Sequence, residues 1–258
     1  DALDRLDAPA ADTSIAVLPF DDMTARGDHG YLADGLADEL LHRLSQSEDV
    51  RVIARTSSFA LRDAGLDIPD IAARLGVRYV LQGSLRESDG ALRITAQLVD
   101  ARENTMVWSE AYERPADDAL TVQRAIAAAL GELLEAEFDA GREPAPSPAA
   151  YERFLQARFY YERRAEGDLE RAERAFLEAL EIDPNLPRAW IGLAAIYNLR
   201  LWVHGELDKA TALGMKRVAL ERALTLDPNS AAAHARLGRV YRYEGNPEAA
   251  KAHFQRAR

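Results

Sequence analysis

The segment richest in groups that could bind a ligand follows a short apolar run at residues 50–54, which is typical of a strand. Within five residues it offers a cation, three hydroxyl groups and an aromatic ring: Arg55, Thr56, Ser57, Ser58 and Phe59. Ligands commonly bind at the carboxyl ends of strands in α/β sheets, so these residues form the candidate ligand-binding segment. The competing interpretation, which we favour, is structural: Thr56 or Ser57 caps the first turn of a helix.

No other residues form a pattern that predicts catalysis or metal binding. The five histidines are scattered, cysteine is absent, and no Gly-Lys-Ser/Thr phosphate loop occurs. A nucleophilic triad or a metal site needs such groups at suitable spacing, so we expect no catalytic residue, no metal and no cofactor. The loop at residues 27–30 could offer backbone N–H groups to an anion, but Asp28 and Asp34 already place negative charge beside the following helix.

The elements that would position these groups alternate between strand and helix in residues 14–138. Apolar or alternating runs predict strands, whereas leucines at helical spacing predict amphipathic helices. We expect strands at 14–20, 50–54, 77–86, 92–100 and 106–112, and helices at 31–44, 68–75 and 116–138. Asp21 and Asp22 are expected to form an acidic turn, and residues 88–90 to close a hairpin. The order β-α-β-α-β-β-β-α indicates an α/β domain with a mixed sheet.

Three closely spaced prolines, Pro144, Pro146 and Pro148, predict an extended spacer between two domains. A length of 258 residues also suits two compact units. We therefore expect a tether at residues 1–13, an α/β domain at 14–142, a linker at 143–149 and a helical domain at 150–258.

Beyond the spacer the pattern is helical and repeats. The last segment shows it most clearly, with Leu237 and Gly238 in a first helix, a turn at residues 245–247, and Ala250 and Phe254 in a second helix. Three such units are expected, the last of them incomplete. The middle unit departs from the pattern, since it carries extra residues around 199–213 and places a large cation, Lys216, at a position that calls for a small residue.

The charge is divided unevenly along the chain, whose net charge is −11. Residues 1–142 carry 14 arginines and 27 acidic residues, whereas residues 143–258 carry 18 basic and 16 acidic residues. An acidic first part is repelled by phosphate backbones, so nucleic acid is not an expected partner. No apolar run approaches the length that a membrane-spanning helix requires.

Two known families resemble these patterns. Residues 150–258 resemble tetratricopeptide repeats, in which paired helices stack into an all-α superhelix. Residues 14–138 resemble TolB amino-terminal-like domains through SIAVLPF at 14–20, YLADGLADEL at 31–40, VIARTSSF at 52–59 and LGVRYVLQGS at 75–84. In that family the α/β module accompanies tetratricopeptide repeats in bacterial signalling proteins, commonly adenylate cyclases or winged-helix regulators. The resemblance implies a sensory or interaction region and supplies no catalytic residue.

The resemblance to tetratricopeptide repeats also implies a concave face that holds a peptide or a partner helix. The candidate partner-binding residues are Arg158, Tyr161, Arg188, Asn198, Trp202, Arg236, Arg239 and Arg242. Trp202, in the inserted segment, is either an exposed anchor or a filler of the widened groove. So many arginines predict an acidic or carboxylate-terminated partner. The apolar end of the third unit, with Tyr241 and Phe254, makes a homodimer a further expectation.

The expected function is that of a non-enzymatic protein-interaction or sensory region in a bacterial signalling protein, where it controls an attached output domain. The alternative is a small-molecule or anion receptor, or a weak enzyme, that uses the loops at residues 27–30 and 55–59. The compartment stays open between cytoplasm and periplasm, and any membrane segment is expected upstream of residue 1.

Overall fold

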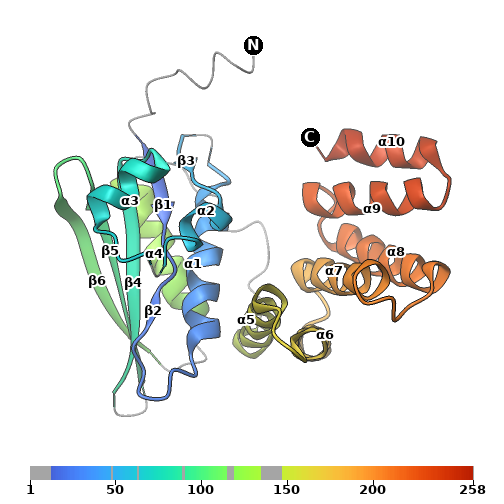
Figure 1. The fold of residues 1–258 in the computed structure, drawn as a ribbon, viewed down its shortest axis with the longest axis horizontal. Coiled ribbons are helices and arrows are strands. Elements are labelled where there is room, and N and C mark those ends of the chain that lie inside the picture. Colours follow the sequence, from blue (N-terminus) through green and yellow to red (C-terminus); the bar gives the residue numbers. More distant parts are fainter. Residues whose placement is uncertain are drawn as a thin grey trace. The chain divides into compact units, whose positions relative to one another are not determined.

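The computed structural model describes residues 13–47, 49–62, 64–88, 91–114, 119–134 and 147–257. The chain divides into two compact units, Asp1–Ala145 and Pro146–Arg258 (Figure 1). The first unit combines helices with a sheet and the second is helical, so the predicted fold class is confirmed.

A six-stranded mixed sheet forms the centre of the first unit. Its strands are β1 (Ser14–Val17), β2 (Asp21–Asp22), β3 (Arg51–Val52), β4 (Tyr79–Ser88), β5 (Ala91–Asp100) and β6 (Thr105–Arg114). The order across the sheet is β3-β1-β4-β5-β6, and β2 pairs with β4 further along that strand. β1 runs parallel to β3 and β4, whereas β4, β5 and β6 form an antiparallel meander.

Helices cover both faces of this sheet. They are α1 (Gly30–Leu44), α2 (Arg55–Phe59), α3 (Ile68–Leu75) and α4 (Ala119–Leu133). α1 and α4 pack against each other on one face, and α3 lies on the other (Figure 1). Ala16 and Val80 pack against Ile71 of α3. Because successive strand side chains point to opposite faces, Ile15 and Leu81 face the other layer, and β1 is buried at every position.

Gly83 of β4 lies in close contact with the ring of Phe20 and with the backbone of β5 in the core. A Cβ atom at this position would lie 2.4 Å from the ring of Phe20 and 2.6 Å from the carbonyl oxygen of Thr95. A larger residue would therefore have to displace the ring and the neighbouring strand.

The observed elements differ from the sequence prediction at several places. Asp21 and Asp22 form β2 rather than a turn. α2 is an additional helix that begins at Arg55 with Ala54 as its N-cap, so the predicted capping role of Thr56 or Ser57 is wrong. The first two strands are shorter than predicted, ending at Val17 and Val52. The tip of the predicted hairpin, residues 89–90, and residues 116–118 and 135–138 of the predicted last helix lie outside the described residues.

Six helices make up the second unit. They are α5 (Pro148–Arg163), α6 (Asp168–Ile182), α7 (Pro187–Trp202), α8 (Lys209–Leu226), α9 (Ala231–Tyr243) and α10 (Pro247–Arg256). They pack as the pairs α5–α6, α7–α8 and α9–α10, and α6 contacts α7 while α8 contacts α9. The extra residues of the middle pair lengthen α8 to 18 residues and form the connection between α7 and α8.

Candidate functional site

Four cations from three helices gather in the second unit: Arg158 of α5, Lys216 of α8, and Arg236 and Arg239 of α9. We call them the cation cluster. Burial is the main reason that the pKa of Lys216 is lowered to about 8, and the charges of Arg239 and Arg236 act in the same direction. Burial is also the main reason that the pKa of Arg236 is lowered, with Arg239 and Arg158 acting in the same direction. Arg236 therefore lies close enough to each of the other three cations for their charges to repel.

Polar groups from the neighbouring helices border this cluster. The ammonium of Lys216 donates a hydrogen bond to Oδ1 of Asn198 in α7 over 2.8 Å. Tyr161 of α5 lies near enough to Arg236 to raise the pKa of that guanidinium. Five of the candidate partner-binding residues thus lie in the cation cluster or beside it: Arg158, Tyr161, Asn198, Arg236 and Arg239. The sequence indicated Lys216 itself only as a departure from the repeat pattern.

The three other candidates make contacts outside the cation cluster. The rings of Trp202 and Tyr243 contact each other with centroids 5.2 Å apart, and Arg242 lies 5.5 Å from the Tyr243 ring. Trp202 is 50% exposed and Tyr243 is 38% exposed, so these three residues form an aromatic cluster open to solvent. Arg188 instead lies 5.1 Å from the ring of Phe154.

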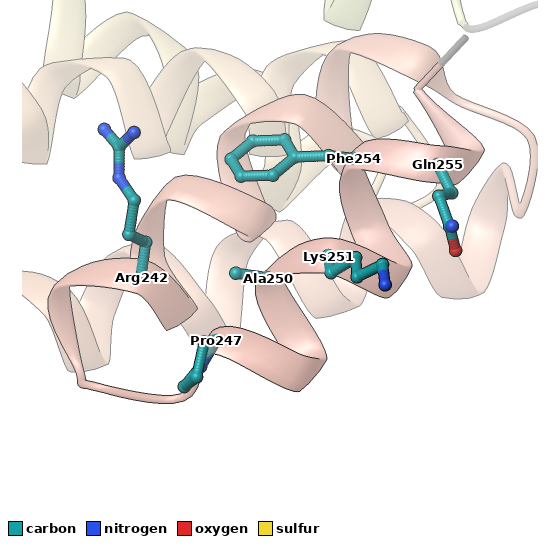
Figure 2. Close-up of a pocket in the computed structure, with 6 residues that line it drawn as sticks. All are labelled: Arg242, Pro247, Ala250, Lys251, Phe254 and Gln255. Atoms are coloured by element: carbon teal, nitrogen blue, oxygen red, sulfur yellow. The ribbon is translucent and has the colours of Figure 1, made fainter.

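A pocket of about 420 Å³ lies on the α9–α10 pair (Figure 2). Ala250 and Phe254 supply apolar surface, while Arg242 and Lys251 place cationic side chains at its border. Pro247 and Gln255 complete the lining. Self-association through this end of the chain stays a prediction. The sequence placed Tyr241 at this end, and in the structure its hydroxyl group donates a hydrogen bond to Glu221 of α8 over 3.3 Å.

The candidate ligand-binding segment forms α2, and two of its side chains are engaged in local contacts. Nε of Arg55 pairs with Oδ1 of Asp38 in α1 at 3.2 Å, and its guanidinium lies 4.1 Å from the ring centroid of Phe59. Ser58 is buried, whereas Thr56 and Ser57 are exposed. The contacts of Arg55 fasten α2 to α1, which gives this residue a structural role whatever else it binds.

A carboxylate of the chain itself already forms a hydrogen bond with the loop at residues 27–30. Asp22 accepts hydrogen bonds from the backbone N–H of His29 over 2.9 Å and from the backbone N–H of Thr24 over 3.0 Å. An external anion would have to compete with this carboxylate for the His29 N–H.

Two histidines that the sequence analysis treated as scattered lie in direct contact. Nδ1 of His234 and Nδ1 of His253 are 2.8 Å apart, and Nε2 of His234 lies 3.0 Å from the carbonyl oxygen of Pro228. Because a carbonyl only accepts, Nε2 of His234 carries a proton, so its Nδ1 accepts the hydrogen bond that His253 donates. The ring of Tyr241 stacks on His253 with centroids 5.4 Å apart.

Lowering the pH from about 7.5 to about 5.5 is expected to destabilise the α9–α10 pair. Burial lowers the pKa of His253 below its ordinary 6.5, and His234 and Arg256 act in the same direction, while Glu221 opposes them. Around these pH values the folded state then binds fewer protons than the unfolded state. The contribution of the neutral His253 side chain to stability is therefore complete above pH 6.5 and is lost as the pH falls. In thermal unfolding, His253→Gln should show a smaller acid-induced decrease in Tm than the unsubstituted chain and the exposed control His204→Gln. Equal decreases in all three proteins would contradict this.

Within the described ranges, no three His, Cys, Asp or Glu side chains are gathered closely enough to hold a metal ion. In the same ranges, none of the helices combines the length and the apolar character that crossing a bilayer requires.

Comparison with protein families divides the chain in the same way as the fold. Residues 11–129 match the family described as HilA/YgeH-like transcriptional regulator, second domain. Residues 161–186 and 231–257 match the tetratricopeptide repeat family, and these ranges leave out α7 and α8. The middle pair is the one that contains the 18-residue helix α8 and that has Lys216 in place of a small residue.

Individual proteins resemble parts of this chain. "Putative adenylate cyclase 3" of Rhizobium meliloti (strain 1021) is 34% identical over 222 residues. The match covers 82% of the present chain but only 38% of the length of that relative. The crystal structure of TolB from Acinetobacter baumannii is similar at 16% identity and a TM-score of 0.36, covering 49% of this chain and 29% of that one. The second tetratricopeptide repeat domain of Spaghetti (RPAP3), bound to an HSP90 peptide, is similar at 19% identity and a TM-score of 0.35, covering 42% of this chain and 89% of that one. The chain therefore combines an α/β domain similar to the second domain of HilA/YgeH-like transcriptional regulators with tetratricopeptide repeats.

Proposed function

We propose that this chain is a non-catalytic interaction region of a signalling protein, in which the helix pairs bind a protein or peptide partner and thereby control an attached output domain. The repeat family supports the first part of this proposal, because stacked helix pairs present extended surfaces to partners. The relative named as an adenylate cyclase supports the second part, since it is much longer than the matched region.

The observation that carries the proposal is the aromatic cluster. Tryptophan, tyrosine and arginine dominate the binding energy of protein interfaces, and here Tyr243 contacts both Trp202 and Arg242 at the surface. A solvent-exposed tryptophan that already packs against a neighbouring ring loses less conformational freedom when a partner covers it.

A catalytic role for the α/β unit has less support. Arg55, the cation of the candidate ligand-binding segment, is paired with Asp38 and packed on Phe59. We therefore expect no saturable turnover of nucleotides or esters by this chain. A turnover that Arg55→Ala abolishes would favour the receptor or enzyme alternative instead.

Peptide binding through the second unit is expected to depend on Trp202. Fluorescence polarisation with short peptides selected from a random array against the whole chain would give the affinities. Trp202→Ala is expected to weaken binding about tenfold or more, because truncating an anchor residue costs about 2 kcal/mol. Arg222→Ala, an exposed arginine on α8, is the matched control and should bind like the unsubstituted chain. If the array yields no peptide, or if Trp202→Ala binds as tightly as Arg222→Ala, the proposal fails.

A further inference from the structure

β6 forms one edge of the sheet in the first unit (Figure 1). Among the described residues it pairs with β5 alone, so its outer side has no neighbouring strand. Successive residues of an antiparallel strand direct their backbone N–H and C=O groups to opposite sides, and roughly half of these groups in β6 therefore point away from β5. Backbone groups at an open edge can form hydrogen bonds with a further strand.

The two edges of this sheet differ in what they offer such a strand. The opposite edge is β3, which consists of Arg51–Val52 alone and is too short to pair with more than a fragment of a partner. β6 has ten residues and no proline. Its pairing with β5 skips Val107 as a bulge and is regular from Trp108 to Arg114, so the outer edge of this segment is also extended.

The side chains of β6 leave this edge accessible. Met106 is 58% exposed and the adjacent Val107 is 45% exposed, which places apolar surface at the start of the edge. Ser109 and Ala111 are small and exposed, and they present little bulk to an approaching backbone. A partner strand could therefore pair with β6 and cover some of this apolar surface.

Charge indicates which kind of strand fits. Glu110 and Glu113 are the charged residues of β6 whose side chains the structure describes, and both are exposed. Tyr112 donates a hydrogen bond to Glu110 over 2.9 Å, and Arg93 of β5 pairs with Glu113 at 3.3 Å in an exposed, weak ion pair. Residues 1–142 carry 27 acidic residues and 14 arginines, so a second copy of this unit would bring like charge to the edge, whereas a basic strand would be attracted.

We propose that the outer edge of β6 binds an extended segment of a partner protein that carries two cationic side chains three residues apart. The segment would add a seventh strand to the six-stranded sheet. Because strand side chains alternate between the two faces, Glu110 and Glu113 lie on opposite faces of β6, and the residues opposite them in a paired strand are also three positions apart. One cation then faces each carboxylate. This surface belongs to the α/β unit, so the inference goes beyond partner binding by the helix pairs.

The test uses the whole chain and the peptide TKVTKVT, acetylated and amidated at its ends so that only the lysines are charged. Titration followed by nuclear magnetic resonance would give its Kd. Binding should slow amide hydrogen exchange within residues 108–113 and leave residues 51–52 unchanged. The isomer TKVKTVT has the same composition but places both lysines on one face. It should bind about fivefold more weakly, because one cross-strand charge pair is lost.

Two variants with the same change of charge separate this edge from a general attraction of cations. Glu113→Lys should weaken TKVTKVT binding by about fivefold or more without loss of Tm, since a like charge replaces an opposite one at an exposed position. Asp49→Lys, at an exposed position just before β3, is the matched control and should bind like the unsubstituted chain.

Three results would overturn the proposal: no binding of TKVTKVT, equal binding of the two variants, or equal binding of a TKVTKVT peptide that is methylated on every backbone nitrogen. The methylated peptide keeps both charges but has no backbone N–H to donate, so it should bind much more weakly. If exchange within residues 108–113 instead slows as the protein concentration rises without peptide, the edge pairs with a second copy of the chain and the basic partner is rejected.

Discussion

Replacing Phe176 by alanine is expected to lower the free energy of unfolding of the second unit by about 3–5 kcal/mol. The side chain is 2% exposed, and its ring fills the space above Gly192, where a Cβ would lie only 2.3 Å from the ring. The ring of Phe154 lies on another side, with centroids 6.1 Å apart. Glycine has no side chain that could move into the vacated space, so most of the cavity between α6 and α7 would remain.

Hydrogen exchange measured on peptides from residues 150–200 would separate this effect from unfolding of the first unit. Leu177→Ala is the matched control, because Leu177 is the next residue of α6 and is 43% exposed. Its loss of stability should stay below about 1 kcal/mol. Equal protection in the two variants would show that the contact between Phe176 and Gly192 does not hold α6 and α7 together.

Helix α3 shows which parts of the fold the sequence predicts most accurately. Both of its ends agree with the prediction because its signals are local: Asp67 accepts a hydrogen bond from the backbone N–H of Asp70, and Gly76 ends the helix with a φ of 63°. These groups interact within one turn of the helix, so their effect does not depend on the rest of the chain.

Elements whose existence depends on distant residues were not predicted. β2 has only two residues, and it forms a strand because Asp21 and Asp22 pair with Ser84 and Leu85 of β4. The short helix α2 similarly depends on the ion pair between Arg55 and a residue of α1. A local pattern of two to five residues carries too little information to indicate such pairing.

The cation cluster and the histidine pair illustrate the same limit for candidate sites. The sequence indicated that Lys216 departs from the repeat pattern and that arginines are frequent on first helices. The proximity of Lys216 to Arg236 follows only from the packing of α8 on α9. His234 and His253 lie on different helices, and the contact between their rings depends on the packing of α9 against α10.

Asp168→Ala is expected to lower the free energy of unfolding of the second unit by roughly 2–4 kcal/mol. Its carboxylate is fully buried at the start of α6. It accepts hydrogen bonds from Nε and Nη2 of Arg163 over 2.7 and 2.6 Å, and from the backbone N–H of Ala165 over 2.9 Å. Alanine would leave these three donor groups without this acceptor and release the turn between α5 and α6. Glu181→Ala, at an exposed position of α6, is the control and should change stability by less than about 0.5 kcal/mol.

The pH dependence of the stability lost in Asp168→Ala identifies the cause of that loss. The hydrogen bonds from Arg163 are the main reason that the pKa of Asp168 lies below its ordinary 3.8. A carboxyl group with a lowered pKa contributes stability that is present above that ordinary value and is lost as the pH falls below it. In urea unfolding, the free energy of unfolding of Asp168→Ala should therefore lie below that of the unsubstituted chain by a constant amount between about pH 7 and about pH 5, and by a smaller amount below about pH 4. If the loss of unfolding free energy is unchanged at low pH, packing rather than the charge of Asp168 stabilises this turn. Because α5 carries Arg158, the turn also helps to hold one member of the cation cluster in place.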